Sequence, residues 1–150
     1  MEKEIGLYVH IPFCESKCFY CNFVSVKAND EDKNNYIVNL MKEIELYKND
    51  DYHIKSIFIG GGTPSCLPVG YISEIINKIK NVFVIKKNCE ITIEVNPNSF
   101  NEEKAQEYKK IGINRISFGL QSANNRLLKS INRIHTKKDF INAVSIARKV

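Results

Sequence analysis

Short apolar segments rich in β-branched residues recur four times along the chain, and each predicts a β-strand. They cover residues 5–11, 54–60, 89–95 and 114–120. The stretches between and after them carry apolar residues at helical spacing. Strand and helix therefore alternate along the whole sequence.

Each of the longer helical stretches presents one apolar face. The first face holds Tyr36, Leu40, Ile44 and Tyr47, the second holds Ile72, Ile75, Ile76, Ile79 and Phe83, and the last holds Phe140, Ala143, Val144, Ala147 and Val150. A third helix is expected over 101–112, with acidic residues in its first turn and Gly112 as its stop signal. Thr136 and Asp139 have the spacing of a capping box, and a shorter helix is expected over 123–130.

This alternation predicts an α/β protein with a parallel sheet and right-handed crossovers. Doubly wound and barrel arrangements both fit it. In either, the chemistry lies beyond the C-terminal ends of the strands. The unusual residues of this chain follow those ends: three cysteines, the segment "GGGTPS" (60–65), Glu94 with "NPN" (96–98), and Gln121. We expect four loops to meet at one mouth.

Composition narrows the class of protein. The 150 residues are 43% hydrophobic and 26% charged, with a formal net charge of +5, as in an ordinary globular domain. No Lys/Arg-rich run with interleaved aromatics points to nucleic acid. The start of the chain does not resemble a signal peptide, and no apolar run is long enough to span a membrane. We therefore expect a cytoplasmic protein with reduced thiols. Five cysteines, an odd number, also argue against a disulfide framework.

Three of those cysteines, Cys14, Cys18 and Cys21, lie within the segment "HIPFCESKCFYCNF" (10–23). Their spacing, C-x3-C-x2-C, is typical of a loop that folds around a metal centre. Iron–sulfur clusters are held by thiolates, and three thiolates leave one iron with an open position for a substrate or cofactor. Zinc is the alternative, with His10, Cys66 or Cys89 as a fourth ligand, although structural zinc usually has two paired hooks.

The chain also resembles a known family. The motif "CESKCFYC" is similar to the signature of the radical S-adenosylmethionine (SAM) superfamily. The wider set "YVHIPFCESKCFYCNF", "FIGGGTPS", "ITIEVNPNS", "GINRISFGLQS" and "INRIH" resembles the oxygen-independent coproporphyrinogen-III-oxidase-like family. That family contains the oxidases and the heme chaperones related to them. The resemblance covers residues 5–136, with the motifs in order.

The resemblance implies that Cys14, Cys18 and Cys21 hold a 4Fe–4S cluster whose fourth iron is chelated by SAM. Electron transfer from the cluster to SAM would then generate a 5′-deoxyadenosyl radical. The protein would orient SAM and exclude water from the site. The residues it places at SAM or a second ligand are Tyr8, Tyr20, Gly61, Gly62, Thr63, Glu94, Gln121 and Arg133.

The same residues have plainer interpretations. The glycines allow close backbone approach to a ligand, but a tight turn needs them too. Glu94 is a ligand candidate because a charge in a parallel sheet needs a partner. An aromatic next to a strand is commonly core, and an arginine commonly lies on the surface. His10 and His135 fall within the motifs but are assigned no catalytic role, while His53, Cys66 and Cys89 fit no motif.

Two features favour the heme-chaperone branch. Phe23 stands where the oxidases of this family carry a further cysteine, and only seven residues precede Tyr8, where the oxidases have a longer segment. Asn22 replaces an Asp common in the chaperones. The partners expected are SAM, heme or a porphyrin, an electron donor and heme-accepting proteins. A coproporphyrinogen III oxidase, an oxidoreductase, is the first alternative, and a metal-stabilised binding module without SAM chemistry is the second.

The family's core is a partial (β/α) barrel of six strand–helix units followed by a further domain, as the resemblance implies. About four units fit here. We therefore expect residues 1–150 to be the N-terminal portion of a radical SAM core domain, truncated and without a second domain.

Overall fold

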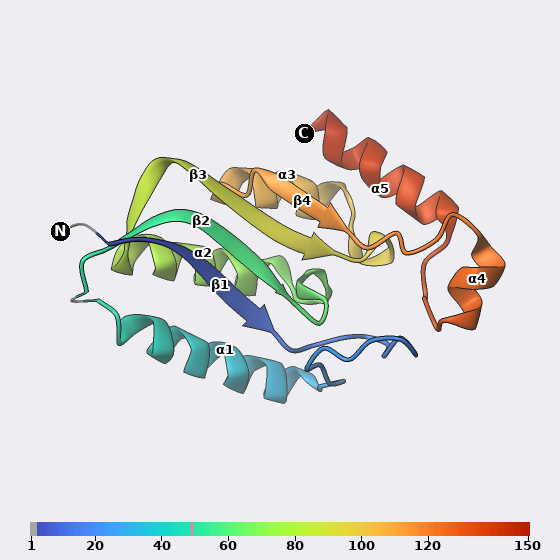
Figure 1. Cartoon of the computed structure of the whole chain (residues 1–150), viewed down its shortest axis with the longest axis horizontal. Coiled ribbons are helices and arrows are strands. Elements are labelled where there is room, and N and C mark those ends of the chain that lie inside the picture. The colour runs from blue at the N-terminus through green and yellow to red at the C-terminus, as the bar shows by residue number, and fades with distance from the viewer. Residues whose placement is uncertain (1–2, 49) are drawn as a thin grey trace.

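The structure, a computed structural model, describes residues 3–48 and 50–150. Its centre is a parallel sheet in which the strands lie side by side in chain order, β1-β2-β3-β4 (Figure 1). The strands are β1 (Lys3–Ile11), β2 (Tyr52–Gly61), β3 (Val84–Val95) and β4 (Arg115–Phe118). All run toward the end of the molecule where the cysteine loop lies. The α/β class and the parallel sheet predicted from the sequence are confirmed.

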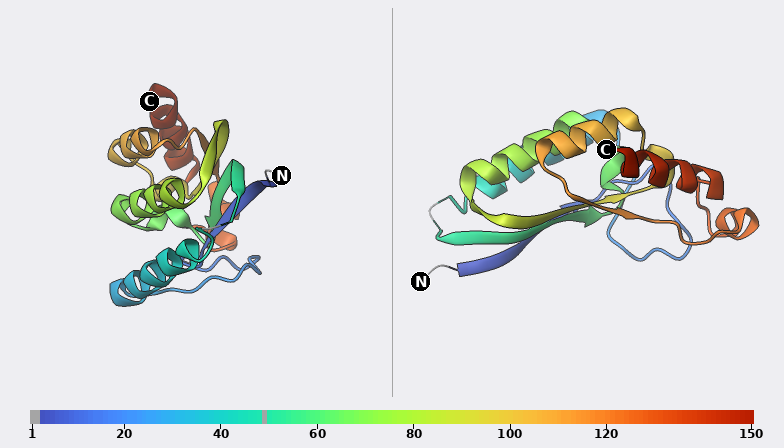
Figure 2. Two further views of the ribbon diagram at one scale, coloured as in Figure 1. Left: turned by 90° about the vertical axis from the view of Figure 1, so that its left-hand side faces the viewer. Right: turned by 90° about the horizontal axis from the view of Figure 1, so that it is seen from above.

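The helices are α1 (Asp30–Glu45), α2 (Val69–Val82), α3 (Glu102–Ile111), α4 (Asn125–Ser130) and α5 (Lys137–Lys149). Figure 2 shows α1, α2 and α3 side by side on one face of the sheet, as crossovers of one hand require. The predicted capping box of Thr136 and Asp139 is present, and Gly112 ends α3 in a left-handed conformation (φ 99°). Within the described residues, no helix is long and apolar enough to cross a membrane.

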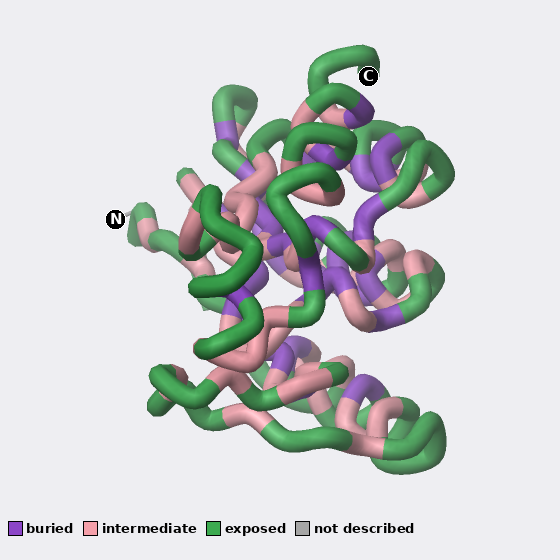
Figure 3. Tube along the Cα trace, turned by 90° about the vertical axis from the view of Figure 1, so that its right-hand side faces the viewer, coloured by how far each residue is buried: buried purple, intermediate pink, exposed green. Residues whose placement is uncertain are grey.

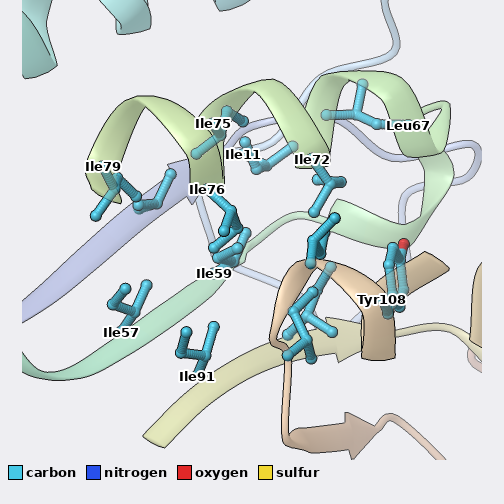
Figure 4. Packing of buried hydrophobic residues seen from close by; sticks show 14 of the residues in the cluster. Ile11, Ile57, Ile59, Leu67, Ile72, Ile75, Ile76, Ile79, Ile91 and Tyr108 are labelled. Carbon is cyan, nitrogen blue, oxygen red and sulfur yellow. The ribbon is translucent and has the colours of Figure 1, made fainter. Parts of the chain in front are cut away.

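The core lies between this helical layer and the sheet. Ile72, Ile75, Ile76 and Ile79 of α2 are fully buried and point toward Ile11, Ile57, Ile59 and Ile91 of the strands (Figure 4). Burying one such side chain contributes about 1.5–3 kcal/mol. This contact makes α2 and the first three strands a rigid support for the loops beyond them.

Two predicted helix faces are confirmed except at their last residue. In α1, Ile44 is buried and Tyr36 and Leu40 pack against the core, while Tyr47 lies beyond the helix and is exposed. In α5, Ala143 is buried and Ala147 packs against the core, while Val150 lies beyond the helix and is exposed.

The four strands are confirmed with different bounds: β1, β2 and β3 begin earlier than predicted, and β4 is shorter. β3 begins at Val84, which pairs with His53. The pairing register between β2 and β3 shifts between Ile54 and Ser56, so a polar stretch of β3 remains unpaired with β2 there. That stretch, "KKN" (86–88), interrupts the run of apolar residues from which a strand is predicted. β4 ends at Phe118 instead of Leu120, and the left-handed backbone of Gln121 (φ 63°) turns the chain away from the sheet.

The face of the sheet opposite the helices is more polar and partly aromatic. Strand side chains alternate between the two faces, so the burial of Ile93 and Val95 against the helices turns Glu94 to the opposite one. On the same side, Tyr8 lies opposite Phe58 and their rings stack with centroids 6.1 Å apart. This face leads to the strand ends where the predicted site residues lie.

Candidate cofactor and cluster site

A cavity of about 280 Å³ lies at the C-terminal ends of the strands. Seen from that end, the segments nearest the viewer are mainly exposed or half-buried, and the buried positions lie behind them (Figure 3). Every predicted site residue except Tyr8 lines this cavity: Cys14, Cys18, Tyr20, Cys21, Gly61, Gly62, Thr63, Glu94, Gln121 and Arg133. The expected meeting of four loops at one mouth is what the structure shows.

The cysteine loop is closed on itself like a short ribbon. The amide of Cys14 donates to the carbonyl of Val26 (3.0 Å), and the amide of Val26 donates to the carbonyl of Pro12 (2.8 Å). Inside the ribbon the amide of Cys21 donates to the carbonyl of Cys18 (3.1 Å). These bonds hold the segment with the three thiols as one unit at the end of β1.

The loop after α4 fastens the other side of the ribbon. The Asn132 side-chain amide donates to the carbonyl of Lys17 (2.7 Å) and to the Ser16 hydroxyl (3.1 Å). The amide of Phe19 donates to the carbonyl of Ile131 (3.2 Å). Asn132 has φ 61°, a conformation that Asn tolerates better than most residues. Residues more than a hundred positions apart thus form one wall of the cavity.

The glycine segment forms the opposite wall and bonds to the same ribbon. The amides of Gly62 and Thr63 donate to the carbonyls of Ile11 (2.9 Å) and Phe13 (2.7 Å). A Cβ on Gly62 would lie 2.6 Å from the Phe13 oxygen and 3.0 Å from Cys14 Sγ. The absence of a side chain at Gly62 therefore lets the cysteine loop lie close to the glycine segment. The SAM contact expected for Gly62 stays a prediction.

Gly61 and Glu94 connect two strand ends beside the cavity. Gly61 has φ 119°, which only glycine adopts without strain, and its amide donates to Glu94 Oε2 (3.1 Å). The Glu94 carboxylate therefore has the partner that a charge in a parallel sheet requires. Its remaining lone pairs face a cavity in which a hydroxyl or ammonium group can bind.

Arg133 reaches across the cavity wall to the cysteine loop. Its Nη2 donates to the carbonyl of Gly119 (2.7 Å), and its Nη1 donates to Cys18 Sγ (3.6 Å). Tyr20 lies beside this pair. Burial raises the pKa of the Tyr20 phenol, the Arg133 charge opposes that rise, and Cys18 adds to it. The thiol of Cys18 thus faces a fixed positive charge.

Tyr8 shares a sheet face with Glu94 but stays outside the cavity lining. Its hydroxyl pairs with His10 Nδ1 (3.0 Å), and His10 Nε2 pairs with the carbonyl of Val24 (3.0 Å). Burial raises the pKa of Tyr8, and the charge of Glu94 adds to this. The SAM contact predicted for Tyr8 stays a prediction, and His10 serves the structure of the ribbon.

Nine of the lining residues were not assigned from the sequence, among them Asn96, Ser117 and Gly119. Asn96 Oδ1 is buried without a hydrogen-bond partner, although the backbone amide of Asn96 donates to Ser65 Oγ (3.0 Å). A buried acceptor without a partner is unfavourable unless a ligand supplies the donor. The sequence signal that could have identified Asn96 is its position in "NPN" (96–98), directly after a predicted strand.

The thiols are free, and their arrangement bears on which metal centre they suit. Within the described part of the chain, no three His, Cys, Asp or Glu side chains are close enough to hold one metal ion. A tetrahedral zinc needs its ligands within about 4 Å of each other, whereas a cubane cluster distributes its thiolates over separate irons. Burial raises the pKa of Cys66 to about 11, and Cys66 Sγ donates to the Phe13 carbonyl, so it is a poor fourth ligand.

Comparison with known proteins defines the class. The family model described as the radical SAM superfamily matches residues 8–150. The chain belongs to this superfamily, as the resemblance of the motif "CESKCFYC" implied.

Within this superfamily, the chain is similar to curated proteins that are named heme chaperones. The "Heme chaperone HemW" of Buchnera aphidicola (Acyrthosiphon pisum strain) is 42% identical over 149 residues, which is 97% of this chain and 40% of the relative. The protein of the same name from Escherichia coli is 34% identical over 146 residues, 95% of this chain and 39% of its own length. The chain therefore spans about 40% of the length of these curated relatives.

A solved structure agrees with this placement. The structure titled "Coproporphyrinogen III oxidase (HemN) from Escherichia coli is a Radical SAM enzyme" matches with a TM-score of 0.88 and 26% identity, over 99% of this chain and 35% of that one. The archaeal Methanocaldococcus infernus Elp3 matches at a TM-score of 0.52 and 18% identity, which supports the fold alone. The open parallel sheet is therefore that of a partial radical SAM barrel.

Proposed function

We propose that this chain binds a 4Fe–4S cluster and SAM as the N-terminal portion of a radical SAM core, in a protein that binds and delivers heme. The observation that carries the proposal is the gathering of Cys14, Cys18 and Cys21 on one cavity that also holds Glu94 and Arg133. Three thiolates, an unpartnered Asn96 oxygen and the Glu94 carboxylate beside them suit a cluster with one open iron and a zwitterionic ligand next to it.

The residues have separate tasks in this proposal. The three cysteines hold the cluster, which when bound to SAM supplies one-electron chemistry at the sulfonium. Glu94 accepts hydrogen bonds from SAM hydroxyl or ammonium groups, and Arg133 offers a cation to its carboxylate. Tyr20, Gln121 and Thr63 line the remaining space. The electron donor, the heme-accepting proteins and a cytoplasmic location stay predictions.

Heme delivery is favoured over porphyrin oxidation by the relatives named heme chaperones. The absence of a cysteine at Phe23 points the same way. Phe23 lines the cavity and is 67% exposed. Because the residue here is phenylalanine, the further thiol of the oxidases has no equivalent at this place in the cavity. The TM-score of 0.88 to a coproporphyrinogen III oxidase keeps that oxidoreductase activity as the alternative.

The test begins with the chain reconstituted anaerobically with iron and sulfide. The proposal expects about four irons and four sulfides per chain and an absorption change on adding SAM. Heme is then titrated into the chain and into a version extended to the length of the relatives. Heme binding without conversion of coproporphyrinogen supports the chaperone function. Conversion of coproporphyrinogen supports the oxidase, and a bound zinc with no response to SAM would leave only the metal-stabilised module.

A further inference from the structure

Arg133 is held in place by more than its contacts to the cavity wall. Besides Gly119 and Cys18, its Nε donates to Nδ1 of His135 (3.3 Å). All three nitrogens of the guanidinium therefore have a partner, each from a different segment of the chain. An arginine fixed at three points presents its charge to the Cys18 sulfur with little freedom to move away.

His135 is the buried member of this chain of contacts. Its side chain is 2% exposed, and its Nε2 bonds to the carbonyl of Leu120 (3.0 Å). Since Arg133 Nε is a donor, His135 Nδ1 must accept, and Nε2 must carry the hydrogen that goes to Leu120. Burial, assisted by the charge of Arg133, lowers the pKa of His135 and keeps the ring neutral, as this arrangement needs. The tautomer follows from the hydrogen-bond network.

We propose that His135 is a positioning residue that fixes the Arg133 guanidinium against Cys18, and thereby raises the reduction potential of the cluster that the three cysteines hold. The proposal rests on the proposed function for the cluster itself. His135, which has no catalytic role in the sequence-based assignment, would then influence the cluster through Arg133.

The physical basis is the charge difference between the two states of the cluster. Reduction adds a negative charge, so a nearby cation and a hydrogen bond to a ligand sulfur favour the reduced state. Partners of this kind, one step removed from the metal ligands, commonly tune metal centres. If Arg133 loses its anchor at Nε, its charge moves over a wider region and is better solvated. The reduction potential then shifts to a more negative value.

Two substitutions separate the two hydrogen bonds of His135. In His135→Asn the side-chain oxygen takes the place of Nδ1, so the anchor for Arg133 is retained while the donor to Leu120 is lost. In His135→Gln the amide nitrogen takes the place of Nε2, so the bond to Leu120 is retained while the anchor for Arg133 is lost. If His135 only stabilised the fold, His135→Asn and His135→Gln would not be expected to differ in the reduction potential of the cluster. His53→Gln, at the start of β2 and far from the strand ends, is the matched control.

The first measurement is the midpoint potential of the reconstituted cluster by EPR-monitored titration. We expect His135→Gln and Arg133→Lys to shift it to more negative values, and His135→Asn and His53→Gln to leave it where it is. Equal potentials in His135→Asn and His135→Gln, or no shift in either His135→Gln or Arg133→Lys, would overturn the proposal.

The second measurement needs no cluster. The exchange rate of the Arg133 Nε–H with water, measured by NMR, reports directly on its anchor. We expect slow exchange in the unmodified chain and in His135→Asn, and faster exchange in His135→Gln. Fast exchange in the unmodified chain would refute the positioning role even if the cluster binds. Slow exchange in a chain that takes up no cluster would instead refute the proposed function.

Discussion

Glu94 Oε2 accepts a hydrogen bond from the backbone amide of Gly61 over 3.1 Å, which ties the end of β3 to the end of β2 beside the cavity. The bond explains how a carboxylate is held on a parallel sheet. It also fixes the direction in which the rest of that carboxylate meets a ligand.

Glu94→Gln retains an oxygen for the Gly61 amide but removes the charge. We expect SAM affinity to fall by about 10–100-fold, the loss of a charge-assisted bond worth about 1.5–3 kcal/mol, with iron content unchanged. Calorimetric titration of the reconstituted protein measures it. Glu90→Gln is the matched control, since Glu90 is paired with Arg115 outside the cavity lining. Equal SAM affinity in Glu94→Gln and the unmodified chain would remove Glu94 from the ligand site.

From the sequence alone, a side chain at Gly62 would be expected to hinder the approach of SAM and to leave the cluster in place. The contact of a Gly62 Cβ with Phe13 and Cys14 changes this expectation. Gly62→Ala should already displace the cysteine loop and lower the iron content after reconstitution. Gly70→Ala is the control, because a Cβ at Gly70 meets nothing within 4 Å and Gly70 lies in α2. There we expect unchanged iron content and a gain in stability of about 0.5–1 kcal/mol. Full iron content in Gly62→Ala would show that the loop adapts.

Replacing Cys14, Cys18 or Cys21 by Ala should abolish cluster uptake, whereas Cys66→Ala and Cys89→Ala should retain it. The first three line the cavity, whereas Cys66 and Cys89 lie outside its lining, and burial raises the pKa of both of these thiols. Cluster absorption and sulfide content after reconstitution distinguish the two groups. A normal cluster in Cys18→Ala would contradict the ligand assignment.

Much of this site was predictable because its residues follow strand ends in sequence. Parallel strands bring their C-terminal ends to one edge, so the cysteines, the glycine segment, Glu94 and Gln121 had to converge. The fold followed from the same alternation, down to the cap of α5 at Thr136.

The remainder depends on contacts that no local pattern encodes. Asn132 bonds to the ribbon at Lys17, and Arg133 bonds to Cys18, over separations of 115 residues. That a Cβ on Gly62 would meet the cysteine loop is visible only from the distance between the two loops. The buried Asn96 oxygen became notable only when its lack of a partner in the structure was known.

His135 gives a pH dependence of stability whose sign follows from its burial. Its ordinary pKa is 6.5, and burial lowers the folded-state value. Between those two values the unfolded chain binds a proton that the folded chain does not. The free energy of unfolding should therefore fall as pH drops below about 6.5. Urea unfolding between pH 7.5 and 5.5 measures this, and His135→Asn should flatten the profile. An unchanged slope in that variant would assign the effect elsewhere.

Strand β4 forms one edge of the sheet, and within the described residues it pairs only with β3. Its free side can pair with another chain. We expect its amides to exchange faster than those of β2 and β3, and the chain to self-associate with rising concentration. A chain extended to the length of the relatives should protect β4, self-associate less and bind SAM more tightly. Full protection of β4 in a dilute monomeric sample would show that its edge is not open.

The most direct test of the cluster assignment is the EPR and ENDOR spectrum of the reduced, reconstituted protein with SAM labelled by ¹⁵N at its methionine amino group. If three cysteines leave one iron open to SAM, the label should give a hyperfine coupling to the cluster. That coupling should vanish when the unlabelled compound is added in excess. A reduced 4Fe–4S cluster that shows no coupling to the label, with a spectrum unchanged by SAM, would contradict the central claim.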